Sequence, residues 1–394
     1  MKERKTALDI LNKTITDSAY SNLLMRYSFD NSQNVPFITN LVYGVLENYD
    51  SLKYQLKGLY DSTSKYNEII LVMSLYEKFI LNKEDYITIN EYVDLAKNEY
   101  DKSFINAVLR KVNTYKEPDI DYIKCNLPEW IYNLLNKQYS KEDFDLIKKN
   151  LSTKKEIYYH INKNKTSFDN LKDLNINIID EYFFTSNNNL TTSELFSEGL
   201  FYIQDINSYK IVKSLDLKEN DLFLDACSAP GSKLFNSLDY IKDSNSYSND
   251  VNEKRVELIR NKAKLLGYND IHYYYFDARE LSKHIDIKFD KILLDVPCSG
   301  LGVISRKPDI KFHLKDTSLD ELQIIQKDIL EDVSKLLKKD GLLCYSTCTL
   351  NKKENSIQVD NFLKSHNDFI KIKDETIFDI KGDMFYYCVI KRII

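Results

Sequence analysis

The spacing of hydrophobic residues changes twice along the chain. In residues 1–112 they recur every three or four positions, as at Leu8, Leu11 and Ile15, which predicts amphipathic helices. The stretch 113–121 contains a proline, which disfavours helix at the residue before it, so we expect a linker there. We therefore predict an all-α domain over residues 1–118.

Residues 119–215 have a mixed pattern. Glu129–Leu135 has helical spacing, Glu156–Asn162 alternates as a strand does, and Asn187–Asn189 is typical of a loop. We predict a small α+β linking domain over this part of the chain.

From residue 216 onward, short apolar strands alternate with helical segments. Glu253–Leu266 is a predicted helix that ends at Gly267, and a second helix is expected to begin with the capping pattern of Ser318 and to end at Gly341. The predicted strands are 222–226, 271–275, 291–295 and 342–346. Strands separated by helices predict a doubly wound, mostly parallel sheet, so residues 216–394 are expected to form an α/β, Rossmann-like domain.

Composition narrows the class of protein. The 394 residues have a formal net charge of -5, so the chain has no overall attraction to nucleic acid and would have to hold RNA through local patches. A mean hydropathy of -0.44, a polar start and the lack of a long apolar run predict a soluble, cytoplasmic protein without a membrane span. The six cysteines form no Cys-x-x-Cys pair and the five histidines do not cluster near them, so we expect neither a disulfide framework nor a metal site.

Aspartates follow the predicted strands, at the edge where open α/β sheets bind ligands. They are Asp225, Asp250, Asp277 and Asp295. Asp250 lies about 20 residues beyond a loop of small residues, where a carboxylate often binds a ribose. That loop consists of Cys227, Ser228, Ala229, Pro230, Gly231, Ser232 and Lys233, and its backbone can approach a ligand closely. The loop lacks the glycine pattern of dinucleotide sites, and some of the aspartates could instead cap helices.

Two cysteines also lie just beyond predicted strands. Cys298 follows Asp295-Val-Pro, and Cys348 lies in Ser-Thr-Cys-Thr. A thiol among polar groups can act as a nucleophile, which indicates covalent chemistry on an electrophilic carbon. The alternative, a buried small apolar residue, is our interpretation for Cys125, Cys344 and Cys388.

A basic pair follows the first of these thiols. Arg306 and Lys307 are candidates for binding a phosphate or ordering the site. A solvated charged loop is the alternative.

These motifs together resemble the RsmB/Nop2/Sun family of RNA cytosine-5 methyltransferases. The resemblance rests on 225–233, 295–302, 306–309 and 345–350, with Glu354 and Asn355. Residues 90–97 and 102–111 are similar to the NusB-like helical RNA-binding domain. Ser232 departs from the family pattern, where a second glycine is usual.

The resemblance implies S-adenosyl-L-methionine as cofactor, bound by residues 227–233 and by Asp250, Asp277 and Asp295. It implies that Cys348 is the nucleophile that adds to C6 of the cytosine, that Asp295 holds the base edge, and that Cys298 assists release. The expected substrate is 16S ribosomal RNA and the expected state is a monomer. A tRNA substrate and a non-catalytic RNA-binding factor remain as alternatives.

Overall fold

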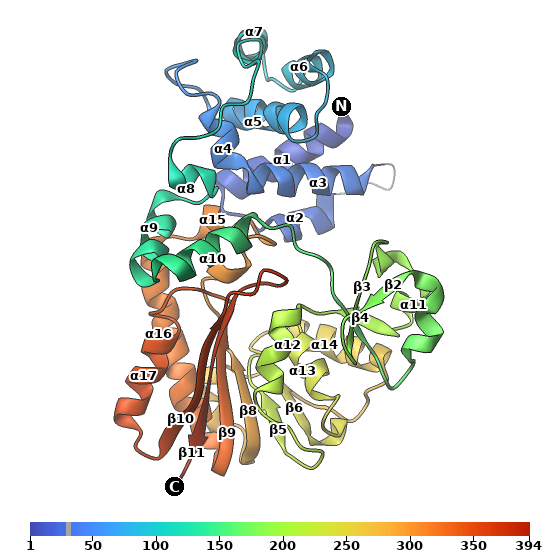
Figure 1. Cartoon of the computed structure of the whole chain (residues 1–394), viewed down its shortest axis with the longest axis vertical. Coiled ribbons are helices and arrows are strands. Elements are labelled where there is room, and N and C mark those ends of the chain that lie inside the picture. The colour runs from blue at the N-terminus through green and yellow to red at the C-terminus, as the bar shows by residue number, and fades with distance from the viewer. Residues whose placement is uncertain (29–32) are drawn as a thin grey trace. The chain divides into compact units, whose positions relative to one another are not determined.

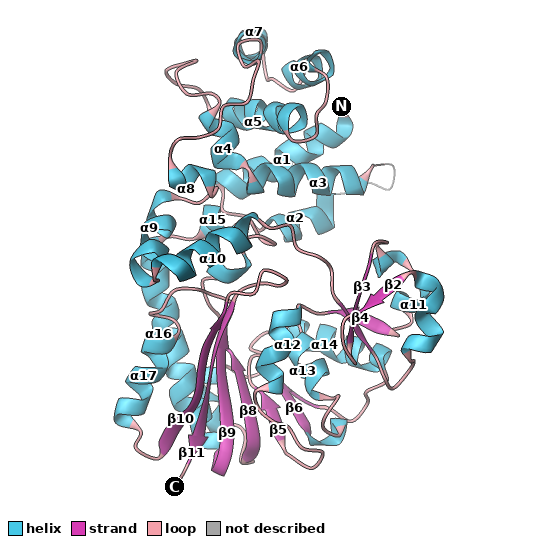
Figure 2. Ribbon diagram, viewed as in Figure 1, coloured by secondary structure: helices cyan, strands magenta, loops and turns pink. Residues whose placement is uncertain are grey.

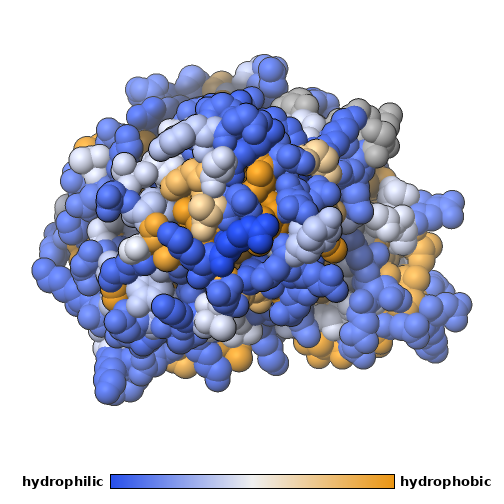
Figure 3. All heavy atoms as spheres, turned by 90° about the horizontal axis from the view of Figure 1, so that it is seen from above, coloured by the Kyte–Doolittle hydropathy of each residue, from blue (hydrophilic) through white to orange (hydrophobic). Residues whose placement is uncertain are grey.

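The computed structural model describes residues 1–28 and 33–394 (Figure 1). Within them the chain divides into two compact units. The first comprises Met1–Phe144 and Ile304–Lys315, and the second comprises Asp145–Val303 and Asp316–Ile394. The described residues include no helix with the length and hydropathy of a membrane span. The face in Figure 3 is mainly hydrophilic, with small groups of apolar residues.

The first unit is helical, as the spacing predicts (Figure 1). Its buried core joins the long helices, and Leu8, Leu41 and Leu71 are fully buried in it. Its helices are α1 (Lys2–Thr16), α2 (Ser21–Ser28), α3 (Val35–Glu47), α4 (Tyr49–Tyr54), α5 (Lys65–Phe79), α6 (Asp85–Val93), α7 (Glu99–Leu109), α8 (Asp121–Lys124), α9 (Glu129–Gln138) and α15 (Ile310–His313), while α10 (Lys141–Ser152) contains the boundary at Phe144.

A short stretch from late in the sequence completes this helical unit. The carboxylate of Asp309 accepts hydrogen bonds from the Ser21 amide (3.1 Å) and hydroxyl (2.9 Å). The Lys311 side chain is 2% exposed, and its Nζ donates to the carbonyl of Asn126 (2.7 Å). Residues 304–315 are therefore an integral part of the helical unit.

The predicted linker 113–121 also packs on the helices. Gln55 donates to the carbonyl of Lys116 (2.9 Å) and accepts from its amide (2.8 Å). The compact unit is consequently larger than the predicted all-α domain, and the three domain boundaries stay a prediction.

The second unit is built on a large sheet with the order β10-β11-β9-β8-β5-β6-β7 (Figure 2). Neighbours from β9 to β7 pair in parallel, whereas β11 pairs antiparallel with both β9 and β10. The strands are β5 (Phe223–Asp225), β6 (Ser246–Asn249), β7 (His272–Tyr274), β8 (Phe289–Asp295), β9 (Leu337–Thr347), β10 (Phe369–Ile377) and β11 (Phe385–Arg392). The doubly wound α/β fold is confirmed.

Helices cover both faces of this sheet. One face packs against α12 (Ile206–Lys213), α13 (Ser232–Ser237) and α14 (Glu253–Leu266), and its core includes Phe223 and Leu293. The other face packs against α16 (Asp316–Val333) and α17 (Ser356–Ser365), and its core includes Leu224 and Leu294. Adjacent residues of one strand thus point into opposite cores, as the period of two requires.

A small antiparallel sheet precedes the large one in the second unit, with the order β2-β3-β1-β4. Tyr159, Phe184 and Phe201 form its aromatic core, with ring centroids 5.3 to 5.5 Å apart. Its elements are β1 (Tyr159–Ile161), β2 (Ile176–Ile178), β3 (Phe183–Ser186), β4 (Phe201–Ile203) and α11 (Glu194–Ser197).

One predicted helix end is wrong. α14 ends at Leu266, with Gly267 in the left-handed region (φ 91°), as expected. α16, however, ends at Val333, and Gly341 lies within β9. A Cβ on Gly341 would come within 2.9 Å of the carbonyl oxygens of Asp290 and Lys338, so this glycine permits close packing of strands and does not stop a helix.

Candidate active site at the edge of the large sheet

From β5 the chain adds β6 and β7 on one side of the sheet. It then crosses to the other side of β5, where β8 pairs with it, so the strand order switches between β5 and β8. Crevices at such switch points are the usual ligand sites of open α/β sheets. Asp225 is the last residue of β5 and Asp295 the last of β8, while Asp250 directly follows β6. The structure therefore brings these three predicted aspartates to one edge.

The small-residue loop after β5 is folded tightly against β6. The Ser228 amide donates to the carbonyl of Asn249 (2.8 Å), and the Ala229 amide donates to the carboxylate of Asp250 (3.3 Å). Gly231 has φ 101°, and a Cβ there would lie 2.9 Å from the ring of Phe235. A glycine is thus required at the position where the loop enters α13.

Asn249, which is not among the predicted site residues, also organises this edge of the sheet. Its side chain is fully buried and donates to the carbonyls of Ala226 (3.0 Å) and Phe276 (3.0 Å), and it accepts from the Phe276 amide (2.9 Å). It thereby ties the loops after β5 and β7 to β6. A polar residue directly before Asp250, at a strand end, was the available signal.

Asp225 is almost completely buried at 1% exposure. Its Oδ1 has no hydrogen-bond partner among the described residues. Burial, with the nearby charge of Asp295, raises the pKa of Asp225 to about 7, although Lys233 opposes the shift. A buried acceptor atom without a partner among the described residues therefore lies at the end of β5, next to the switch point.

Asp295 has two partners of its own. Lys233 Nζ donates to its Oδ2 (2.5 Å), and Ser346 Oγ donates to its Oδ1 (3.0 Å). The last residue of β8 is thereby linked to the small-residue loop on one side and to β9 on the other.

The two predicted thiols are in contact. The Sγ atoms of Cys298 and Cys348 lie 3.2 Å apart, and no disulfide joins them. The hydrogen bond with Cys348, together with burial, raises the pKa of Cys298. Burial raises the pKa of Cys227 as well, so neither Cys227 nor Cys298 is set up as a ready thiolate.

The other predicted residues have different surroundings. Asp277 pairs with Arg279 (2.6 Å) and accepts from its amide, so it caps the short helix after β7. Arg306 and Lys307 belong to the helical unit, and their role stays a prediction. Cys344 and Cys388 are fully buried, as predicted for core residues, whereas Cys125 is half-buried.

These residues fit the predicted cofactor. Carboxylates suit ribose hydroxyls and a positively charged sulfonium, and Asp225 provides a buried oxygen without a partner among the residues described. The described residues include no cluster of three or more His, Cys, Asp or Glu side chains that could hold a metal ion.

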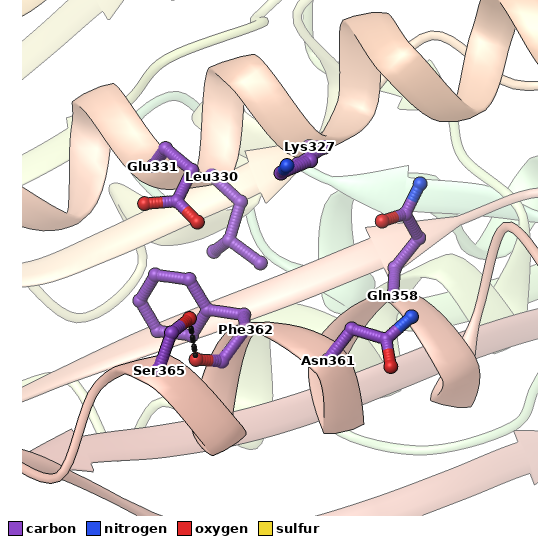
Figure 4. Close-up of a pocket in the computed structure, with 7 residues that line it drawn as sticks. All are labelled: Lys327, Leu330, Glu331, Gln358, Asn361, Phe362 and Ser365. Atoms are coloured by element: carbon purple, nitrogen blue, oxygen red, sulfur yellow. Dashed lines mark hydrogen bonds between the residues drawn. The ribbon is translucent and has the colours of Figure 1, made fainter.

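A pocket of about 340 Å³ lies elsewhere in the second unit, between α16 and α17 (Figure 4). Its lining residues are Lys327, Leu330, Glu331, Gln358, Asn361, Phe362 and Ser365. None of them is a predicted site residue, and we assign the pocket no role.

Comparison with protein families identifies both parts of the chain. Residues 212–385 match the family described as 16S rRNA methyltransferase RsmB/F, and residues 1–114 match the NusB family. The predicted NusB-like region is thereby confirmed.

Curated relatives match over most of their length. The chain is 32% identical to the probable ribosomal RNA small subunit methyltransferase B of Bacillus subtilis, covering 93% of this chain and 89% of that protein. It is 25% identical to ribosomal RNA small subunit methyltransferase B of Pasteurella multocida, with 92% and 89% covered.

Solved structures agree in fold. The crystal structure of PH0851 covers 98% of both chains with a TM-score of 0.79 at 19% identity. NSun6 from Pyrococcus horikoshii, solved with SFG, covers 68% of this chain and 98% of its own, with a TM-score of 0.60 at 17% identity.

Proposed function

Because this chain belongs to the RsmB/F family of 16S rRNA methyltransferases, we propose that it transfers a methyl group from S-adenosyl-L-methionine to C5 of a cytosine in 16S rRNA. The observation that supports this chemistry most is the 3.2 Å contact between the thiols of Cys298 and Cys348, at the sheet edge that Asp295 shares. Two adjacent thiols suit a reaction in which one forms a covalent bond and the other assists its cleavage.

The cofactor would bind against the small-residue loop and the carboxylates beside it. Asp250 would accept from the ribose hydroxyls, and the backbone of residues 227–233 would line the bound molecule. Asp277, held by Arg279, would border the base. When bound, S-adenosylmethionine supplies an electrophilic methyl group on a sulfonium sulfur.

The first covalent step belongs to Cys348. Its sulfur adds to C6 of the cytosine, the C5–C6 double bond opens, and C5 gains the electron density that it needs to accept a methyl group. Asp295 holds the pyrimidine edge and supports protonation at N3, so that the ring carries no net negative charge during addition. Lys233 keeps the Asp295 carboxylate in place.

Release reverses the addition. After methylation, a base removes the proton from C5, the C5–C6 double bond forms again, and the bond from C6 to the Cys348 sulfur breaks. Cys298 lies against that sulfur and would assist as a proton donor, because its raised pKa favours the protonated thiol.

The RNA must present an unstacked base to the thiol, as base-modifying enzymes require. Unstacking costs least in a loop or an unpaired segment. The names of the relatives from Bacillus subtilis and Pasteurella multocida support the small-subunit RNA as target. We further propose that the enzyme works as a cytoplasmic monomer, and that Arg306 and Lys307 contact RNA phosphates.

The test is Cys348→Ala, with Cys125→Ala in the helical unit as matched control. We expect Cys348→Ala to lose methyl transfer to 16S rRNA completely while still binding S-adenosylmethionine in calorimetry, and the control to keep both. Bisulfite sequencing of 16S rRNA and tRNA from a deletion strain then identifies the RNA. Full activity of Cys348→Ala excludes the proposed nucleophile, and loss of 5-methylcytosine from tRNA alone excludes the proposed substrate.

A further inference from the structure

The buried carboxylate of Glu354 lies close to the two thiols. Glu354 has no exposed surface, and its side chain accepts several hydrogen bonds. Ser299 donates twice, from its amide (2.9 Å) and its hydroxyl (2.5 Å), and Gln326 (3.0 Å) and Asn351 (3.1 Å) donate through their amide groups. All these donors are neutral and buried, so the carboxylate holds a small polar network together inside the protein.

The network connects the loop after β8 with the loop after β9. Ser299 is the residue next to Cys298, and its hydroxyl also lies 2.6 Å from the hydroxyl of Thr349, the residue after Cys348. Gln326 extends from α16 and donates as well to the carbonyl of Pro297, on the other side of Cys298 (2.9 Å). The backbone on both sides of Cys298 is therefore held through Glu354 and its partners.

Cys348 has anchors that do not depend on this carboxylate. It directly follows β9, and its carbonyl accepts from the amide of Gly302 (2.9 Å). Thr347, the residue before it, donates to Asn355 (2.5 Å). Loss of the Glu354 carboxylate should consequently move Cys298 more than Cys348.

We propose that Glu354 is a positioning residue, which holds the thiol of Cys298 against the sulfur of Cys348 for the release step. This inference rests on the proposed function, because release assumes a covalent bond between Cys348 and the base. The negative charge of Glu354 also contributes to the raised pKa of Cys298, so the same group favours the protonated thiol.

The sharpest control is a second buried carboxylate of the same unit. Asp332 is 5% exposed and accepts from both the amide (2.7 Å) and the hydroxyl (2.6 Å) of Ser282, as Glu354 does from Ser299. Lys335, which is exposed, also donates to Asp332 (3.3 Å). Asp332→Asn thus neutralises a buried, hydrogen-bonded carboxylate and removes one exposed ion pair, at a place that touches neither cysteine.

The first measurement concerns geometry and needs no RNA. In diamide, the two thiols lose two protons and two electrons to the reagent and form a disulfide, at a rate that depends on how closely they are held. Dividing this rate by the rate at which iodoacetamide alkylates Cys298 in a Cys348→Ala background corrects for altered thiol acidity. We expect the ratio to fall by about tenfold or more in Glu354→Ala, less in Glu354→Gln, and not in Asp332→Asn.

The second measurement follows the reaction. Glu354→Ala should accumulate a protein–RNA adduct on denaturing gels with S-adenosylmethionine present, and should lower kcat more than it raises KM. Glu354→Gln keeps the shape of the side chain and serves if the alanine variant does not fold. A cross-linking ratio and an adduct level equal to those of Asp332→Asn overturn the proposal. If neither Cys298→Ala nor Glu354→Ala forms an adduct while the ratio still falls, the proposed chemistry fails and the positioning of the thiols stands.

Discussion

Lys233 and Asp295 form an ion pair across the two strand ends that flank the switch point. Nζ of Lys233 lies 2.5 Å from Oδ2 of Asp295, and the two side chains are 9% and 28% exposed. The loop after β5 is thereby fixed to the end of β8, and the charge of the lysine partly opposes the rise in the pKa of Asp225. Lys233 and Asp295, which the sequence assigns separately to cofactor binding, thus bind each other in an ion pair.

Lys233→Met should destabilise the folded protein, because it leaves the largely buried carboxylate of Asp295 without its cation. We expect a loss of about 3 kcal/mol in the free energy of unfolding, measured with urea, and strongly reduced methyl transfer. The control is Lys242→Met, which removes a lysine paired with Glu219 at the surface, with side chains 56% and 69% exposed. Such pairs contribute little, so an equal effect of both substitutions contradicts the prediction.

Cys298→Ala should separate addition from release. If Cys298 assists elimination, its variant still forms the bond between Cys348 and the base but breaks it slowly. Denaturing gels should then show a covalent protein–RNA adduct, which disappears in the double variant with Cys348→Ala. Free RNA in every lane would rule out this role of Cys298.

The raised pKa of Asp225 predicts that the free energy of unfolding depends on pH. Its pKa is raised from 3.8 to about 7 in the folded protein, so the folded state holds a proton that the unfolded state has lost. The resulting stabilisation is fully present below 3.8 and disappears as the pH rises through about 7. Asp225→Asn cannot titrate, so its Tm relative to the wild type should rise across this interval.

A constant difference between the two Tm curves would contradict this assignment. Asp270→Asn, at an exposed position, controls for the change in net charge.

Gly302 should not tolerate a side chain. Its amide donates to the carbonyl of Cys348, and a Cβ would lie 2.1 Å from the carbonyl oxygen of Met384 and 2.9 Å from that of Cys348. We expect Gly302→Ala to cost about 2 kcal/mol and to lower methyl transfer by displacing Cys348, as followed by thermal unfolding and a methylation assay. Gly58→Ala is the control for backbone strain without a steric clash, because a Cβ there meets nothing within 4 Å although φ is 77°. It should lower stability and leave methyl transfer unchanged, so equal activity losses would speak against the contact.

Local patterns were sufficient to predict much of the fold. The helix Glu253–Leu266 and its glycine stop follow from spacing and backbone preference alone. The predicted strands 222–226 and 291–295, which overlap β5 and β8, could be recognised because both faces of these strands are largely buried. The end of α16 could not, since the role of Gly341 depends on how closely β9 approaches the carbonyl of Asp290.

The residues of the candidate site could be predicted one by one, but the hydrogen bonds and contacts between them could not. Strand ends and motif residues indicated where Asp225, Asp295 and the thiols lie. The partners of those residues come from elsewhere in the chain: Gln326 extends from the middle of α16, in a helix whose apolar spacing gives no sign of a polar link to Pro297. Only tertiary packing decides which buried polar groups meet.

The helical unit has a consequence for biosynthesis. Its first 144 residues leave the ribosome well before Ile304–Lys315, yet that later stretch belongs to the same compact body. Until it emerges, the ring of Tyr49 lacks the edge-on contact with Phe312 (5.3 Å), and Ser21 lacks Asp309. The nascent residues 1–144 therefore cannot complete their fold until residue 315 has been translated, and a gene fragment that stops at residue 144 encodes an unfinished unit.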